Sequence, residues 1–311
     1  MTTSPASGNQ PTEACHRLAR RAGRALLELM RSDPRLVVPA ILAILAQEPG
    51  VGMLRSLGKL LNLVDLKAHP ELVNSLRDGL CEAALEASDP VVSRHALEAM
   101  RTLLRKHVMA TPLREDQVTA LAALLGDAAR GSARRPALEL LLRHQPEHSL
   151  FADTLLTLSR SEADLDLRVL ALRGLRRIPD DRADELMLEL LRTEVEPRVL
   201  WDVAGASNFL TQPTRRREEY KGAYRALLRR EVQDPARGRA AQSLALLATL
   251  DGDHSVAEDL RFLAGTTPSP TLAEAARTVA AQLEDGSASF ATIARAWETY
   301  HRTLDRKQYP W

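Results

Sequence analysis

Most of the chain repeats one pattern of apolar and polar positions. An acidic residue, usually followed by proline, opens a run in which Val, Ala and Leu recur three and four positions apart. That spacing places the apolar side chains on one face of a helix. No segment alternates Val, Ile, Thr and Tyr as a strand does, so the pattern predicts an all-α protein. The openings are Asp33-Pro34, Asp89-Pro90, Asp166, Glu196-Pro197 and Asp234-Pro235.

Each opening has the chemistry of a helix start. An Asp or Glu side chain accepts hydrogen bonds from the free N–H groups of the first turn, and its charge suits the positive end of the helix dipole. Proline at the first helical position removes no helix hydrogen bond, because a backbone N–H at that position has no partner within the helix. We therefore expect a helix to begin at each opening.

The openings return at the spacing of a helical repeat. From Asp89 onward they are separated by about 77, 30 and 38 residues, whereas a pair of helices with its turns needs roughly 30–47. The long first gap holds a degenerate copy at 132–141, and a last copy begins at Pro268. Apolar runs at 117–125, 183–191 and 256–263 supply partner helices, which predicts about fourteen to sixteen helices in all.

This pattern resembles the HEAT repeat family, including bacterial HEAT-like repeats. Besides the acid–Pro openings, it is carried by a valine three residues after an opening acid and an alanine in the next turn: Val92, Val169, Val199, Ala96 and Ala171. The resemblance covers most of residues 33–285, although Ser93, Leu170 and Leu200 stand where the family commonly places Arg. It implies a right-handed α-solenoid of HEAT-like helix pairs, an armadillo-type fold, and no particular activity.

Two segments fall outside the array, so we divide the chain into three parts. Residues 1–12 are rich in Pro, Ser and Gly and are expected to be disordered; 13–285 form the solenoid; 286–311 form a C-terminal capping helix and an aromatic tail. The chain shows no signal peptide and no apolar stretch near the roughly 18 residues that span a bilayer. Cys15 and Cys81 make no metal or disulfide pattern, so a cytoplasmic location is expected.

Charge is balanced overall but uneven along the chain. The formal net charge is +1, which argues against a protein that coats nucleic acid. Residues 215–230 are nevertheless strongly basic, and four of their cations recur at helical spacing: Arg217, Lys221, Arg225 and Arg229. We call these four the basic stripe. It is either a patch for phosphate or an acidic partner, or, as we favour, a solvated outer face with acids of the next helix nearby.

The first predicted helix, residues 13–31, is amphipathic and basic. Its apolar positions are Leu18, Ala22, Ala25, Leu26 and Leu29, and five arginines load the other side. Such a helix can lie on a membrane surface or dock in a groove. The end of a repeat array also needs a polar outer face, and we favour that capping role because no Trp or Phe lies on the apolar face.

The sequence contains few motifs that would indicate an enzyme. His144 and His148 are four apart, but Pro146 interrupts the helix that would bring both rings together over a metal. The chain lacks the His-Glu dipeptides of the iron-binding HEAT-like hydroxylases. Trp201-Asp202 resembles the Trp-and-Asp arrangement of HEAT-like alkylpurine DNA glycosylases, but the family's acid follows the Trp by about four residues, where this chain has Gly205. We predict no enzyme, no catalytic residue, no metal and no cofactor; Asp202 is expected to be an exposed or capping acid.

Aromatic residues crowd the C-terminal end. Phe290, Trp297 and Tyr300 share a helix on which their rings can seal the last repeat, and the tail ends in Tyr309-Pro310-Trp311. The tail is either packed or a short peptide that docks in a partner's pocket through its aromatic anchors.

We predict a non-enzymatic scaffold or adaptor that binds a protein partner along an extended solenoid surface. The candidate contact residues are the basic stripe and four aromatics: Arg217, Lys221, Arg225, Arg229, Trp297, Tyr300, Tyr309 and Trp311. One alternative is a nucleic-acid-binding or DNA-repair protein related to the alkylpurine glycosylases, which requires an inward-facing basic stripe. The other is a membrane-surface adaptor that works through residues 13–31.

Overall fold

The computed structural model describes residues 13–47, 49–107, 112–144, 149–176, 181–205, 216–306 and 309, with side chains from residue 21 onward and, after the third gap, from residue 151. Regular structure within these ranges consists of sixteen α-helices and one short 3-10 helix, without strands. The all-α prediction is therefore confirmed for the described residues. The chain divides into two compact units, Met1–Gln145 and Pro146–Trp311.

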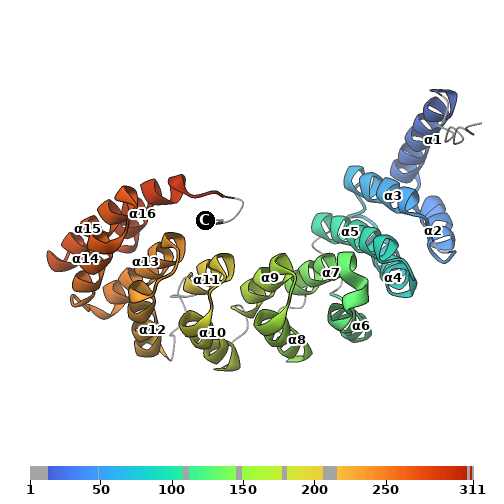
Figure 1. The fold of residues 1–311 in the computed structure, drawn as a ribbon. Helices are drawn as coiled ribbons and strands as arrows, with labels where there is room; N and C mark the ends of the chain where they lie inside the picture. Colours follow the sequence, from blue (N-terminus) through green and yellow to red (C-terminus); the bar gives the residue numbers. More distant parts are fainter. Residues whose placement is uncertain are drawn as a thin grey trace, which may run out of the picture. The chain divides into compact units, whose positions relative to one another are not determined.

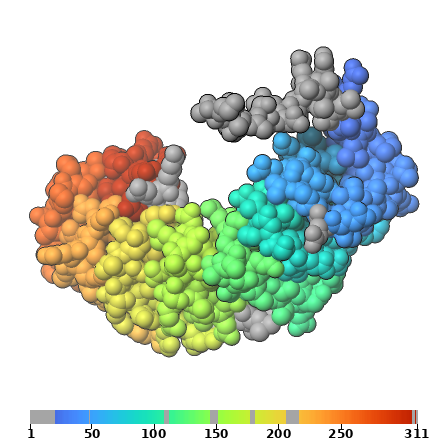
Figure 2. Space-filling view, turned by 45° about the vertical axis from the view of Figure 1, so that its right-hand side comes forward, coloured from blue at the N-terminus to red at the C-terminus, as the bar shows by residue number. Residues whose placement is uncertain are grey.

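The first unit contains seven of the α-helices (Figure 1). They are α1 (Glu13–Ser32), α2 (Pro34–Leu45), α3 (Val51–Leu63), α4 (Pro70–Glu86), α5 (Pro90–Lys106), α6 (Glu115–Gly126) and α7 (Gly131–His144). Two rows form within the unit, because α2 packs on α4 and α4 on α6, while α3 packs on α5 and α5 on α7. The helices α3 and α5 lie side by side at the surface of this unit (Figure 2).

The second unit contains the remaining nine (Figure 1). They are α8 (Ser149–Ser161), α9 (Leu165–Leu175), α10 (Asp181–Thr193), α11 (Pro197–Ala204), α12 (Arg217–Arg229), α13 (Asp234–Asp251), α14 (Val256–Thr266), α15 (Pro270–Glu284) and α16 (Phe290–Thr303). The even-numbered helices α8 to α14 pack in one row and the odd-numbered α9 to α15 in a second. Helix α16 closes the unit against α13 and α15.

The helix starts follow from short-range chemistry. Asp33, Asp89 and Glu196 each cap a helix whose first residue is the following proline, and their carboxylates accept a backbone N–H of the first turn. At the third opening the cap is Asp164 rather than Asp166, which lies inside the first turn of α9. The predicted helix is therefore present, but the prediction that Asp166 caps it is wrong.

Small residues let neighbouring rows approach closely. The core of both units is mainly Leu and Ala, with few rings. At Gly238 on α13, a Cβ atom would lie 2.6 Å from Cε1 of Tyr300 on α16. Only glycine therefore lets α16 settle this close to α13.

Candidate interaction surfaces

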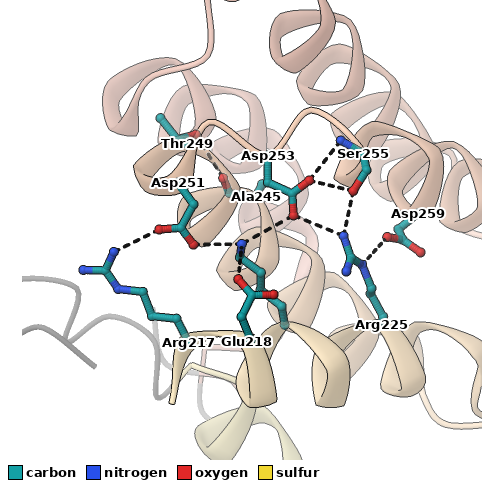
Figure 3. A network of polar contacts seen from close by, with 10 residues as sticks. Arg217, Glu218, Arg225, Ala245, Thr249, Asp251, Asp253, Ser255 and Asp259 are labelled. Carbon is teal, nitrogen blue, oxygen red and sulfur yellow. Dashed lines mark hydrogen bonds and ion pairs between the residues drawn. The ribbon is translucent and has the colours of Figure 1, made fainter. Parts of the chain in front are cut away.

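The basic stripe lies beside a row of acids, and Figure 3 shows Arg217 and Arg225 reaching toward them. Helix α13 ends at Asp251, and Gly252 caps it in the left-handed conformation (φ 66°). Glycine adopts this conformation without strain because it has no Cβ atom. The acids on either side of that turn, together with one acid of α14, reach toward α12. They are Asp251, Asp253 and Asp259.

Each stripe residue has an acidic partner. Arg217 Nη1 lies 2.9 Å from Asp251 Oδ1. Arg225 donates from Nε to Asp259 Oδ2 (2.8 Å) and from Nη2 to Asp253 Oδ2 (3.2 Å). Arg229 Nη2 donates to the other oxygen of Asp259 (2.8 Å), and its guanidinium lies 5.3 Å from the ring centroid of Phe262.

Lys221 lies at the centre of this network. Its side chain is only 3% exposed, and its ammonium is 2.8 Å from Asp251, 2.9 Å from Glu218 and 3.4 Å from Asp253. Burial tends to lower its pKa, but the hydrogen bonds to Asp251 and Glu218 outweigh burial and raise the pKa above its ordinary value. A hydrogen bond from Lys221 in turn lowers the pKa of Asp251.

Four cations of the basic stripe thus meet four carboxylates, those of Glu218, Asp251, Asp253 and Asp259. Acids of the following helix and turn lie beside the stripe, as our favoured interpretation expects, but Lys221 is buried rather than solvated. The partner-binding role of these four residues stays a prediction. The network by itself joins α12 to α13 and α14.

We expect Lys221→Met to destabilise the second unit by about 2 kcal/mol at neutral pH, because it leaves Asp251 and Asp253 with fewer counter-charges while keeping the side-chain length. The carboxyl of Asp251 has a depressed folded-state pKa, so its stabilisation is present above the unfolded pKa near 3.9 and is lost as pH falls through the lower folded value. The difference between variant and parent should therefore shrink below about pH 4.

Urea unfolding at several pH values measures this difference. The control is Arg277→Met on α15, whose exposed pair with Glu274 should contribute at most about 1 kcal/mol. A Lys221 variant as stable as the Arg277 variant at pH 7 would contradict the structural role of the network.

Three of the C-terminal aromatics, Trp297, Tyr300 and Tyr309, are buried in the second unit, whereas Phe290 at the start of α16 is 45% exposed. Trp297 is fully buried and donates from Nε1 to the carbonyl oxygen of Gly238 (3.0 Å). Tyr300 is 2% exposed. Tyr309 is also buried; its hydroxyl donates to Gln233 Oε1 (3.1 Å), and its ring centroid lies 5.4 Å from that of Trp201. This arrangement fits the capping interpretation of α16, while Trp311 lies outside the described residues.

Asp202 is buried, contrary to the expectation of an exposed acid. It lies on α11 with 6% of its surface exposed and accepts a bidentate pair of hydrogen bonds from Arg173 of α9, from Nε (2.8 Å) and Nη2 (2.9 Å). Arg176 Nη2 lies 3.5 Å from the same carboxylate. Asp202 therefore holds α9 and α11 together.

A third guanidinium lies close to this group. Arg239 of α13 stacks on Trp201 with its guanidinium 5.2 Å from the ring centroid, and donates to Gln242 Oε1 (2.8 Å). Burial, and then the charge of Arg176, lower the pKa of Arg239 to about 10. Burial, and then Arg239, lower the pKa of His301 to about 4, so His301 is neutral at neutral pH. No pattern along the sequence indicates this cluster, because its members come from four helices.

The remaining candidates offer no assembled chemistry. His148 lies outside the described residues, and within those residues no group of three or more His, Cys, Asp or Glu side chains is arranged to hold a metal ion. Burial, and then Asp78, raise the pKa of the Cys81 thiol to about 12, so this sulfur is a weak nucleophile at neutral pH. A cavity of about 300 Å³ between α10 and α12 has a mixed-charge lining: Glu185, Leu188, Glu189, Arg192, Thr193, Arg216 and Glu219.

Helix α1 differs from its expected packing. Of the predicted apolar positions, Leu26 and Leu29 are 41% and 42% exposed, and Ala22 and Ala25 are exposed too. Among the α1 side chains that the structure describes, from residue 21 onward, only Met30 is completely buried. None of the described helices combines the length and apolar character that crossing a bilayer requires. The membrane-surface alternative for this helix stays a prediction.

Comparison of the chain with protein-family models, with curated proteins and with solved structures finds no match.

Proposed function

We propose that this protein is a non-enzymatic interaction scaffold built as an α-solenoid of HEAT-like helix pairs, with a protein as its partner. The observation that carries the proposal is the packing order inside each unit. Consecutive helices pack in pairs, as α10 does with α11, and helices of neighbouring pairs contact those two places along, as α10 does with α12. Stacked helix pairs of this kind present long surfaces on which binding is spread over many side chains.

A protein partner is favoured over nucleic acid by the state of the basic stripe. The nucleic-acid alternative needs Arg217, Arg225 and Arg229 to face a phosphate backbone. Their contacts with Asp251, Asp253 and Asp259 neutralise much of the charge that phosphates would meet. The net charge of +1 also provides little long-range attraction for a polyanion.

The test is affinity capture of the full chain from its native lysate, with and without nuclease, followed by reconstitution of the complex from purified components. We expect a protein that is retained after nuclease treatment and that co-elutes with the chain in a fixed stoichiometry. Recovery of nucleic acid alone, or of proteins that disappear with nuclease, would overturn the scaffold proposal.

A further inference from the structure

A second group of cations lies on the first unit, and three helices contribute to it. Helix α5 carries Arg94, Glu98, Arg101 and Arg105 at spacings of four, three and four, which place them on one helix face. Helix α3 adds Arg55 and Lys59, and α7 adds Arg135 and Glu139. We call these eight residues the three-helix basic face.

Contacts between helices place seven of these eight side chains on one side of the unit, and Lys59 lies one helical turn after Arg55 on α3. Arg55 Nε of α3 donates to Nε2 of His95 on α5 (3.2 Å). Arg105 Nη2 of α5 donates to Oδ1 of Asn62 on α3 (3.2 Å). Arg101 of α5 pairs with Glu139 of α7, which also accepts from Arg135 Nε (3.2 Å). The face therefore runs without interruption across the row α3, α5, α7.

The charges of the three-helix basic face do not cancel. Its six cations meet two carboxylates, and both of these are already engaged: Glu98 with Arg94 and His95, and Glu139 with Arg101 and Arg135. The remaining three cations lack a carboxylate partner among the described residues. Arg55 donates to His95 and Arg105 to Asn62, and Lys59 makes no ion pair with any residue that the structure describes. The basic stripe of α12, by contrast, pairs its cations with an equal number of acids.

His95 holds part of this face rigid. Guanidinium groups can only donate, so Nε2 of His95 accepts from Arg55 and from Arg94 (3.0 Å), and its proton lies on Nδ1. Nδ1 then donates to Glu98 Oε2 (2.9 Å). Arg55 is thereby positioned before any partner arrives, which lowers the entropic cost of binding.

We propose that the three-helix basic face docks an extended acidic segment, rich in Asp and Glu, of the protein partner; this inference rests on the proposed scaffold function. From Arg94 to Arg105 the α5 helix rises about 16 Å. An extended peptide of about five residues covers that length, with carboxylates within reach of Arg55, Lys59 and Arg105. Arginine suits this task because its planar fork binds a carboxylate through two parallel hydrogen bonds.

Side-chain chemistry favours a peptide over nucleic acid on this face. The sequences of α3, α5 and α7 contain no Phe, Trp or Tyr, so bases have no ring on which to stack. Glu98 and Glu139 lie among the cations and would repel a continuous phosphate backbone, whereas a peptide can place its neutral residues opposite them.

The test uses the full chain and a dye-labelled peptide of alternating Glu and Ala, with anisotropy as the readout. We expect binding that weakens with salt and is absent for the matched Gln and Ala peptide. The double variant Lys59→Glu, Arg105→Glu should weaken binding at least about tenfold. Lys59→Gln, Arg105→Gln should cause a smaller loss and guards against misfolding, which circular dichroism checks. The control Arg261→Glu, Arg277→Glu makes the same charge change at exposed sites of the second unit and should leave the affinity unchanged.

Four results would overturn this inference. The first is no binding of the Glu and Ala peptide at millimolar concentration, and the second is no effect of either double variant of Lys59 and Arg105. The third is an equal effect of the control double variant of Arg261 and Arg277. The fourth is a DNA duplex that binds more tightly than the peptide and whose binding the Lys59→Glu, Arg105→Glu variant abolishes. The scaffold proposal fails separately. A captured partner that still binds the Lys59→Glu, Arg105→Glu variant would support the scaffold proposal and contradict only the docking of an acidic segment on the three-helix basic face.

Discussion

Asp202→Asn should destabilise the second unit by about 3–5 kcal/mol, the usual cost of breaking a buried ion pair by removing one partner. The substitution keeps the shape of the side chain but removes the charge that Arg173 and Arg176 share. Arg176, whose side chain is 13% exposed, cannot recover the loss by turning into water without disturbing the packing between α9 and α11.

Urea unfolding followed by tryptophan fluorescence measures this effect selectively, because Trp201, Trp297 and Trp311 all belong to the second unit. The matched control is Asp153→Asn on α8. Its carboxylate pairs with Arg182 at 2.7 Å, but both side chains are more than half exposed, so the change should cost at most about 1 kcal/mol. Equal stability of the two variants would show that Asp202 is not a structural charge.

Trp297→Ala should cost about 3–5 kcal/mol and should detach α16 from α13 before the rest of the unit unfolds. The indole is fully buried, so its removal leaves a cavity and also removes the hydrogen bond to the Gly238 carbonyl. Hydrogen exchange at the backbone amides of α16 gives the local readout, and the fluorescence of Trp201 gives the global one.

Two further substitutions divide this effect into its parts. Trp297→Phe retains most of the apolar volume but loses the hydrogen bond to Gly238, and we expect a loss of about 1–2 kcal/mol. Phe290→Ala, on the same helix but 45% exposed, should change stability by less than about 1 kcal/mol. Unchanged exchange at α16 in the Trp297→Ala variant would contradict its role as the anchor of this helix.

The two groups of cations, the basic stripe and the three-helix basic face, differ in how far acidic residues neutralise them. The basic stripe was the most conspicuous charge run in the sequence, because its four cations recur on one helix. Three of its four neutralising acids, Asp251, Asp253 and Asp259, lie 28 to 34 residues further along the chain, around the end of α13 and on α14. A scan along one helix cannot register them, since the pairing depends on how α12 packs against its neighbours.

The three-helix basic face shows the opposite case. No single helix among α3, α5 and α7 carries a conspicuous run of cations. The four-three-four spacing from Arg94 to Arg105 can be read from the sequence. These residues form a larger basic surface only because α3, which carries Arg55 and Lys59, packs beside α5. The Asp202 cluster was missed for the same reason, because Arg173, Asp202 and Arg239 come from three separate helices.

The sequence by itself determined the helices of this protein: the all-α class, the starts at Asp33, Asp89 and Glu196, and, outside α1, many of the inward Leu and Ala positions. Caps, proline and periodic apolar residues act over a few positions, so their effect can be read locally. Only the tertiary structure decided which charges are neutralised, which rings are buried and which cations remain available. Those outcomes depend on electrostatics and packing between residues tens of positions apart, and these interactions exist only once the rows of helices have assembled.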